Sequence, residues 1–400
     1  MNPKLRGKGI GDNHCLMIDC AILTSPLQVH IARAIKQAGG WLGFDAFMNL
    51  ALYSPGLGYY ANAREVFGLM PQADGDQGGD FATAPEMSRL FGQTLATQIA
   101  QALQATQTSE IWEFGAGTGV LARDLLDELT TLGVQVSRYT IVDLSGSLRL
   151  RQQKTLASHR VKVQWRDALP DTIQGVVIGN EVLDAMPVKL LVRTAGQWLE
   201  RGVALAFEPK PEQAPEFTWA DQATLLRPPL EIAGEHDYLT ETHQQGEAFV
   251  RTLAGRLCAG AMFLIDYGFP EAEYYHLQRH MGTVMCHQAH RSDTNPLAQV
   301  GLKDITSHVN FTAIALAGQE AGLEVLGYAS QARFLMNCGL LARLQTSSLQ
   351  DKVMAQKLIL EHEMGELFKV IGFVKKPTGA VEGKSWQAIG FAQGDRTHTL

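Results

Sequence analysis

Short apolar runs alternate with amphipathic segments through the middle of the 400-residue chain. Their length and composition predict buried strands at 111–114, 139–142, 161–165, 176–178 and 262–265. Apolar residues at helical spacing follow the first two runs, over 120–132 and up to about residue 158. Strands that alternate with helices favour a parallel sheet covered on both faces. The expected fold class is therefore α/β.

The residues before this alternation are predicted to be mainly helical. Apolar positions at intervals of three and four indicate helices over 26–39, 44–52 and 85–105. A Gly- and Asp-rich segment, 68–80, is typical of a loop. Residues 1–25 show no clear periodicity and are interpreted as a flexible leader. We expect 26–108 to form an N-terminal helical region that acts as a lid.

Two long stretches interrupt the strand spacing. In the first, 188–258, we expect a β-hairpin around Ala195-Gly196, then a Pro- and Glu-rich loop, then mostly helix from residue 222. We interpret this stretch as an insertion that walls a substrate cleft. The second, 269–308, is rich in polar residues. Residues 109–187 and 259–395 are then left for the α/β core.

Composition restricts the class of protein. The chain is 46% hydrophobic and 19% charged with a net charge of −7, which fits a folded soluble protein without a general affinity for nucleic acid. No apolar run approaches the ~18 residues of a membrane span. An odd number of cysteines without a C-x-x-C pair indicates neither disulfides nor a metal site. We expect an intracellular protein, cytoplasmic if bacterial and in the mitochondrial matrix if eukaryotic.

A glycine-rich loop joins the first predicted strand to its helix. The dinucleotide pattern G-x-G-x-x-G would need a glycine at position 120, where the chain has Val120. The pattern is instead acid-x-G-x-G-x-G, which is typical of methyltransferases that bind S-adenosylmethionine (SAM), although a plain strand–helix turn is the alternative. The candidate SAM-binding residues here are Glu113, Gly115, Ala116, Gly117, Thr118 and Gly119.

Acidic residues follow the next three strands. Asp143 is placed to accept both ribose hydroxyls of an adenosyl ligand, or to cap the next helix. Asp167 could reach the adenine amine, or serve the loop in which it lies. Asn180, Glu181 and Asp184 leave the carboxyl end of the fourth strand, where ligands bind in open α/β sheets, although acids at a helix start also act as caps.

The chain resembles the MidA-type class I methyltransferases, a family that includes a mitochondrial complex I assembly factor. The resemblance rests on the following segments: 47–60, 80–92, the glycine loop, Asn180-Glu181 to Pro187, Asp266-Tyr267-Gly268 and 304–311. It departs at Ala116 and Thr118, where the family often has Pro and Arg. The resemblance implies a Rossmann-like, seven-stranded sheet, SAM as cofactor, and methylation of an arginine in a respiratory-complex protein.

The implied reaction assigns further roles. Glu181 and Asp184 would hold the cationic guanidinium, because carboxylates bind its planar fork, and Asp266 and Tyr267 are second choices. His308 could relay the released proton, although a structural histidine is the alternative. The lid would bring Tyr59, Tyr60 and Phe81 to the adenine or the substrate channel, or into the core. Pro85 and Glu86 lie on a turn that enters a helix, where they would serve the site or cap the helix.

Three readings stay open: a protein arginine methyltransferase, a small-molecule methyltransferase, and a SAM-binding assembly factor. A nicotinamide dehydrogenase is disfavoured by Val120. The sequence is compatible with a homodimer and with a protein partner that presents an arginine.

Overall fold

The computed structural model describes residues 25–62, 83–143, 146–159, 162–208, 213–375 and 386–400. The predicted loop 68–80, candidate residue Phe81 and all but the end of the predicted leader lie outside them. Among the described residues, no helix has both the length and the apolar character to cross a membrane. The described cysteines are free; Cys258 is exposed, and Cys286 and Cys338 are buried. No group of three potential metal ligands occurs in this part of the chain.

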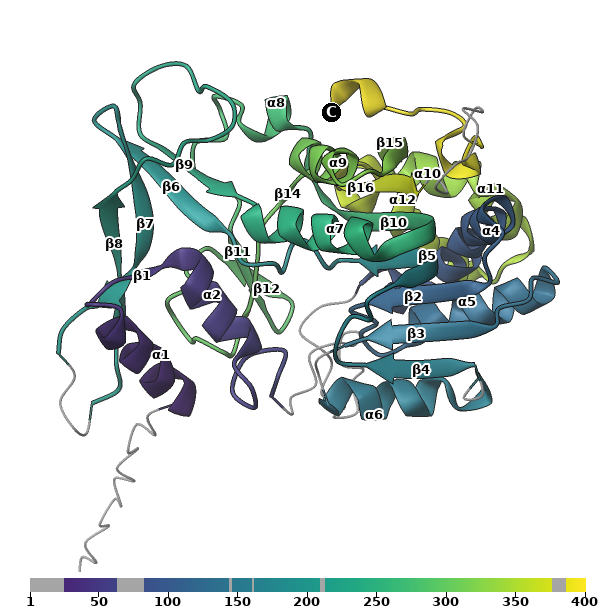
Figure 1. Ribbon diagram of the computed structural model, residues 1–400, viewed down its shortest axis with the longest axis horizontal. Helices are drawn as coiled ribbons and strands as arrows, with labels where there is room; N and C mark the ends of the chain where they lie inside the picture. The colour runs from purple at the N-terminus through teal and green to yellow at the C-terminus, as the bar shows by residue number, and fades with distance from the viewer. Residues whose placement is uncertain (1–24, 63–82, 144–145, 160–161, 209–212, 376–385) are drawn as a thin grey trace, which may run out of the picture.

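A central sheet organises the larger part of the molecule (Figure 1). Its order is β15-β16-β10-β5-β2-β3-β4, with the short β14 beside β10. The neighbours from β10 to β4 are parallel, whereas β16 runs antiparallel to β10 and β15. The strands are β2 (Glu110–Phe114), β3 (Arg138–Val142), β4 (Val163–Arg166), β5 (Ile173–Asn180), β10 (Leu257–Phe269), β14 (Val309–Asn310), β15 (Glu324–Ser330) and β16 (Phe368–Lys375).

This sheet confirms the expected α/β fold. The five strands predicted from apolar runs correspond to β2, β3, β4, β5 and β10. The pattern did not identify β15 and β16 as strands, and these complete the seven-stranded path that the family resemblance implies.

Helices cover both faces of the sheet, so the central strands are apolar on both faces. On β5, Val176 and Ile178 belong to one buried cluster and Val177 to the other. The first cluster includes residues of α4 (Arg89–Thr106), α5 (Val120–Thr131), α10 (Gln331–Asn337), α11 (Leu340–Thr346) and α12 (Leu349–Ile359). The second includes residues of α7 (Gln244–Arg256) and α9 (Phe311–Glu320).

A second lobe lies beside the central sheet, on the left of Figure 1. It contains α1 (Pro26–Gln37), α2 (Phe44–Tyr53) and a sheet of order β1-β7-β6-β9, with β8 paired to β7. Buried residues such as Phe44, Leu190 and Ile305 form its core. Its strands are β1 (Leu42–Gly43), β6 (Lys189–Thr194), β7 (Gln197–Leu205), β8 (Phe217–Ala223), β9 (Tyr238–Thr242), β11 (Met285–Gln288), β12 (Arg291–Asp293) and β13 (Asp304–Thr306).

The remaining helical elements are α3 (Ala84–Met87), α6 (Gly146–Thr155), α8 (Glu271–Tyr274), a π-helical turn at Glu361–Gly365, and 3-10 turns at Ala157–His159, Ile389–Phe391 and Thr397–Thr399.

The structure corrects the expected division of the chain. The predicted helix over 222–257 is wrong in its first part, because β8 and β9 occupy this region before α7 begins at Gln244. Helix α7 packs on the central sheet rather than in the inserted lobe. Similarly, the expected lid region 26–108 is divided: its first helices join the second lobe, whereas α4 packs on the central sheet.

The predicted hairpin is confirmed. Strands β6 and β7 pair antiparallel up to Thr194 and Gln197, across Ala195 and Gly196. Both turn residues have positive φ, 49° and 76°, as a two-residue hairpin turn of type I′ requires.

Candidate functional site

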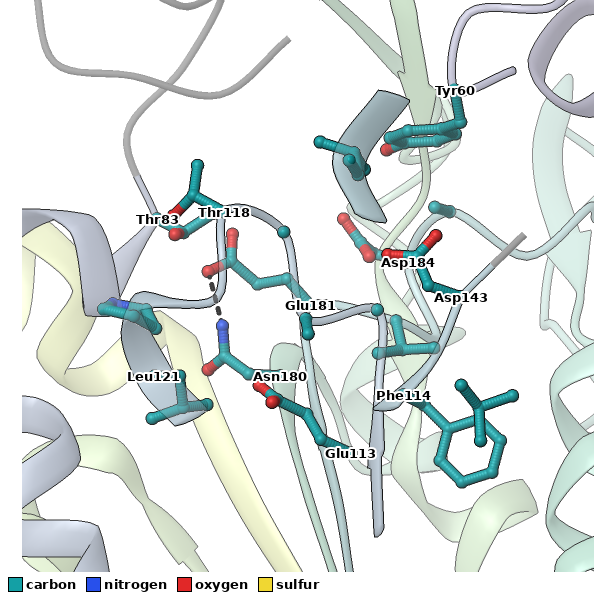
Figure 2. Close-up of a pocket in the computed structure, with 18 of the residues that line it drawn as sticks. Tyr60, Thr83, Glu113, Phe114, Thr118, Leu121, Asp143, Asn180, Glu181 and Asp184 are labelled. Atoms are coloured by element: carbon teal, nitrogen blue, oxygen red, sulfur yellow. Dashed lines mark hydrogen bonds between the residues drawn. The ribbon is translucent and has the colours of Figure 1, made fainter. Parts of the chain in front are cut away.

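A cavity of about 620 Å³ lies at the carboxyl ends of β2, β3 and β5. Both the central sheet and the second lobe contribute to its wall. Thirteen of the residues predicted from sequence line it: Tyr60, Pro85, Glu86, Glu113, Gly115, Ala116, Gly117, Thr118, Asp143, Asp167, Asn180, Glu181 and Asp184. Figure 2 shows ten lining residues labelled, with Glu113, Asn180 and Glu181 grouped on one side and Tyr60 and Asp184 on the other.

The glycine loop forms the part of the cavity wall that follows β2. Gly115, Gly117 and Gly119 all have positive φ, at 63°, 51° and 86°. A Cβ at Gly115 would also come within 3.3 Å of the Val182 side chain, so this position favours glycine on two grounds. Gly119 does not line the cavity, because it faces Gln152. The glycines thus leave the main chain of the loop open to a ligand.

Asp143 is oriented by Gln152, a residue that was not predicted from the sequence to belong to the site. Gln152, fully buried on α6, donates from Nε2 to Asp143 Oδ2 at 2.8 Å and to the carbonyl of Gly117 at 3.0 Å. Trp165 Nε1 donates to Gln152 Oε1 at 2.9 Å, which fixes the direction of the amide. One side chain therefore connects the glycine loop to the carboxylate that ends β3. Asp167, which follows β4, also lines the cavity.

Glu113 is a buried carboxyl at the end of β2, with only 2% of its surface exposed. Tyr139 donates its hydroxyl to Glu113 Oε2 at 2.8 Å. Burial raises the pKa of Glu113 to about 8, and the nearby Asp143 contributes in the same direction. The side chain is thus placed where a positively charged ligand would favour its ionised form.

The turn after β5 is held by a carboxylate beneath it. Asp266 Oδ2 accepts the backbone N–H groups of residues 182, 183 and 184 at 2.9–3.2 Å, and Oδ1 accepts that of Tyr267. Burial and the carboxylates of Asp184 and Glu181 raise the pKa of Asp266, and these N–H groups oppose that rise. Asp266 does not line the cavity. Its position is that of a residue that shapes the turn.

Glu181 adopts a backbone conformation that is uncommon for residues other than glycine, with φ of 52°. Asn180 Nδ2 donates to Glu181 Oε1 at 3.0 Å, and Figure 2 shows this bond as a dashed line. Burial, reinforced by the charge of Asp184, raises the pKa of Glu181 to about 8. Strained backbone of this kind persists where the surroundings enforce it and is common at functional sites.

The two carboxylate oxygens of Asp184 differ in their hydrogen bonding. The Tyr267 hydroxyl donates to Oδ2 at 2.6 Å. Oδ1 is buried and accepts no hydrogen bond from the described residues, and the same holds for Oδ1 of Asn180. Burial raises the pKa of Asp184 to about 6. Because an unsatisfied buried acceptor is costly, these oxygens indicate a site that awaits donors from a ligand.

His308 is not brought to the cavity. Its ring lies between those of Tyr267 and Phe269, with centroids 5.3 Å from each. Burial lowers the pKa of His308 to about 4, with further contributions from Arg279 and Lys369. Its position matches the alternative of a structural histidine.

Tyr59 and Tyr267 also lie outside the lining. Tyr59 is buried in the core of the second lobe, and Tyr267 contacts the site through Asp184.

Several residues that line the cavity were not predicted from the sequence. They include Tyr53, Phe114, Leu148, Phe249 and Asp304. Tyr53 and Tyr60 stack with ring centroids 5.6 Å apart, and the Tyr60 hydroxyl reaches the Asp304 carboxylate. Asp304 begins the segment 304–311, one of the segments on which the family resemblance rests. That resemblance was the only feature of the sequence that could have pointed to Asp304 as a site residue. Nothing in its local pattern marks it as a site residue.

The fold and this cavity together define a class: an α/β methyltransferase that uses SAM. The chain belongs to the Methyltransf_28 family of S-adenosyl-L-methionine-dependent methyltransferases, whose sequence profile matches residues 94–329. It is 47% identical to a protein from Burkholderia thailandensis crystallised with S-adenosyl-homocysteine, with a TM-score of 0.85 over 94% of this chain and 96% of that one.

Curated relatives are more distant. The chain is 27% identical to the mitochondrial protein arginine methyltransferase NDUFAF7 of Danio rerio, over 85% of each chain. It is also 27% identical to that of Homo sapiens, over 82% of this chain and 76% of the human one. The expectations of an enzyme, of a methyltransferase and of SAM as its cofactor are therefore confirmed.

Proposed function

We propose that the chain is a protein arginine N-methyltransferase. The observation that carries this proposal is the buried Oδ1 of Asp184, which lies beside Glu181 and has no hydrogen-bond partner among the described residues. Seven carboxyl side chains line the cavity, and none of the described lining residues is Lys, Arg or His. A cofactor with one net positive charge offsets the charge of only one carboxylate, and a cation in the cavity favours the ionised form of the others. Such a wall therefore favours a cationic methyl acceptor.

The geometry of the cavity wall formed by the central sheet is compatible with SAM. Glu113, the loop 115–119, Asp143, Asp167 and Asn180 would hold it. Asp143 is oriented by Gln152 to accept ribose hydroxyls, and the loop glycines leave room against the main chain. The unpartnered Oδ1 of Asn180 is available for a donor group. When bound, SAM supplies an electrophilic methyl group on a sulfonium.

The acceptor half would bind and orient a guanidinium. Glu181 and Asp184 can accept its N–H groups, which localises positive charge on the bound nitrogens and leaves the remaining one more nucleophilic. Bond formation to the methyl group makes that nitrogen lose a proton. Asp184 or Glu181 would receive it, because His308 lies outside the cavity.

The protein target is proposed by analogy. The curated relatives carry the name protein arginine methyltransferase and are mitochondrial proteins. We propose a subunit of an NADH dehydrogenase-type respiratory complex as the target. The assignment of the chain itself to a bacterial cytoplasm or a mitochondrial matrix stays a prediction, as does a homodimer.

Mass spectrometry of proteins captured by this enzyme, with and without SAM, tests the proposal. A +14 Da mark on arginine that needs SAM supports it. A methylated small molecule would favour the small-molecule reading, and a stable unmarked complex would favour an assembly factor.

Variants locate the chemistry. Glu181→Gln and Asp184→Asn are expected to lower the methylation rate at least about tenfold while SAM still binds, because each removes a charge-assisted hydrogen bond. Asp221→Asn, on β8 and paired with Arg201, is the matched control outside the cavity. Equal rates in all three variants would show that the acceptor site is misassigned.

A further inference from the structure

A third carboxylate reaches the acceptor end of the cavity from the second lobe. Asp304 starts β13, is 2% exposed, and lines the cavity together with Glu181 and Asp184. Strand β13 is tied to the same turn, because the N–H of Ser307 donates to the carbonyl of Asp184 at 3.0 Å. Two lobes with separate cores therefore bring their carboxylates to one place.

The Asp304 carboxylate is held by a tyrosine from a distant segment. The Tyr60 hydroxyl lies 2.8 Å and 2.9 Å from its two oxygens, so one proton is shared across both. The neighbouring Lys303 is directed elsewhere, since its Nζ donates to Asp293 Oδ2 at 2.6 Å. Asp304 is close enough to Glu181 for its charge to contribute to the raised pKa of that residue.

Two aromatic rings stand next to Asp304. Tyr53 and Tyr60 stack at an interplanar angle of 23°, and the Tyr53 hydroxyl donates to the carbonyl of Ala185 at 2.8 Å. Both side chains line the cavity, and Figure 2 shows the hydroxyl end of Tyr60 directed toward the region of Asp184. Planar guanidinium groups combine carboxylate hydrogen bonds with contact against aromatic faces, whereas an ammonium is a compact point charge.

We propose that Asp304, oriented by Tyr60, is an acceptor-binding residue that holds a guanidinium from the second lobe while Glu181 and Asp184 hold it from the central sheet. This inference rests on the proposed function and deepens it. It predicts preference for a planar cation with several N–H donors over an ammonium. It also predicts that the bound acceptor links the two lobes.

Calorimetry with three SAM analogues tests this without knowledge of the protein target. In each analogue, nitrogen replaces the sulfonium and carries a short chain in place of the methyl group. The chains end in a guanidinium, an ammonium or a neutral amide. S-adenosyl-homocysteine carries no group beyond the sulfur, so its affinity measures binding to the cofactor part of the cavity alone. Its binding also shows that each variant is folded.

For the unaltered enzyme, we expect the guanidinium analogue to bind at least about tenfold more tightly than the amide analogue. Asp304→Asn is expected to weaken the guanidinium analogue at least about tenfold, equivalent to about 1.4 kcal/mol, and to change S-adenosyl-homocysteine binding less than twofold. Tyr60→Phe keeps the ring and is expected to weaken the guanidinium analogue about threefold. Glu273→Gln, an exposed acid outside the cavity, should change neither.

The outcomes separate the two proposals. If the unaltered enzyme does not distinguish the guanidinium from the amide analogue, the guanidinium acceptor itself is refuted. If it does, but Asp304→Asn and Tyr60→Phe both bind the guanidinium analogue as the unaltered enzyme does, only the role of Asp304 is refuted. Equal weakening of the guanidinium and amide analogues would also refute it, because the effect would then not depend on the cation.

Discussion

Replacement of Glu113 by Gln is expected to make the ligand-free enzyme more stable and its cofactor binding weaker. The folded state raises the pKa of this carboxyl from 4.5 to about 8. Between these pH values the folded protein keeps a proton that the unfolded chain has released. Stability therefore falls as pH rises through this window, and the loss is complete above pH 8. The Gln variant has no charge to bury, and Tyr139 can still donate to its amide oxygen.

The magnitude follows from the size of the pKa change. At about 1.4 kcal/mol per pH unit, the ionised carboxyl costs the folded state on the order of 5 kcal/mol at pH 9. An unfolding entropy of about 2.1 cal/mol/K per residue gives roughly 0.8 kcal/mol/K for the chain, so the Tm of Glu113→Gln should exceed that of the unaltered enzyme by roughly 6 °C. At pH 5.5 the difference should shrink to about 1–2 °C.

Calorimetric or fluorescence melts without ligand at pH 5.5 and pH 9 measure this difference. Glu110→Gln is the matched control on the same strand; it loses the pairing with Arg138 and should show no gain at pH 9. The second arm is SAM binding, which Glu113→Gln should weaken about tenfold by loss of a charge-assisted contact. The reasoning is refuted if Glu113→Gln gains no stability between pH 5.5 and pH 9.

Three further outcomes are expected. Asp143→Asn should weaken SAM binding about tenfold or more in titration calorimetry, and Gln152→Leu should do so to a smaller extent because it releases the Asp143 carboxylate; unchanged affinity in both would contradict ribose binding here. Asp266→Ala should lower the free energy of unfolding by about 2–3 kcal/mol, because three buried N–H groups of the turn lose their acceptor, and a loss under about 0.5 kcal/mol in urea titration would argue against this. Gly260→Ala should cost about 3 kcal/mol or prevent folding, since its Cβ would lie 1.8 Å from the carbonyl oxygen of Gly175; a normal melting temperature would contradict it.

Local signals were sufficient for much of the central sheet and for the cofactor half of the site. The central parallel strands are apolar runs because helices cover both faces of the sheet, so their pattern is visible without their neighbours. The glycine loop and Asp143 follow strand ends directly, and the carboxyl ends of parallel strands share one edge. For the same reason Asn180, Glu181 and Asp184 were predicted to meet, and all three line the cavity.

Patterns were less informative where elements depend on distant partners. Strand β9 and the end of β8 were predicted as helix, because these residues become strand only by pairing with β6 and β7. His308 was a reasonable acid–base candidate in the sequence, but its surroundings of Tyr267, Phe269 and neighbouring cations decide its neutral, buried state.

The sequence by itself determined an α/β methyltransferase core and the strand ends that line its cavity, because both depend on residues close together in the chain. The acceptor side was decided by tertiary structure. Tyr60 and Asp304 are separated by 244 positions, and Gln152 reaches Asp143 and Gly117 from the next helix. No spacing rule connects such residues, since their contacts arise only when the cores of the two lobes have formed and packed against each other.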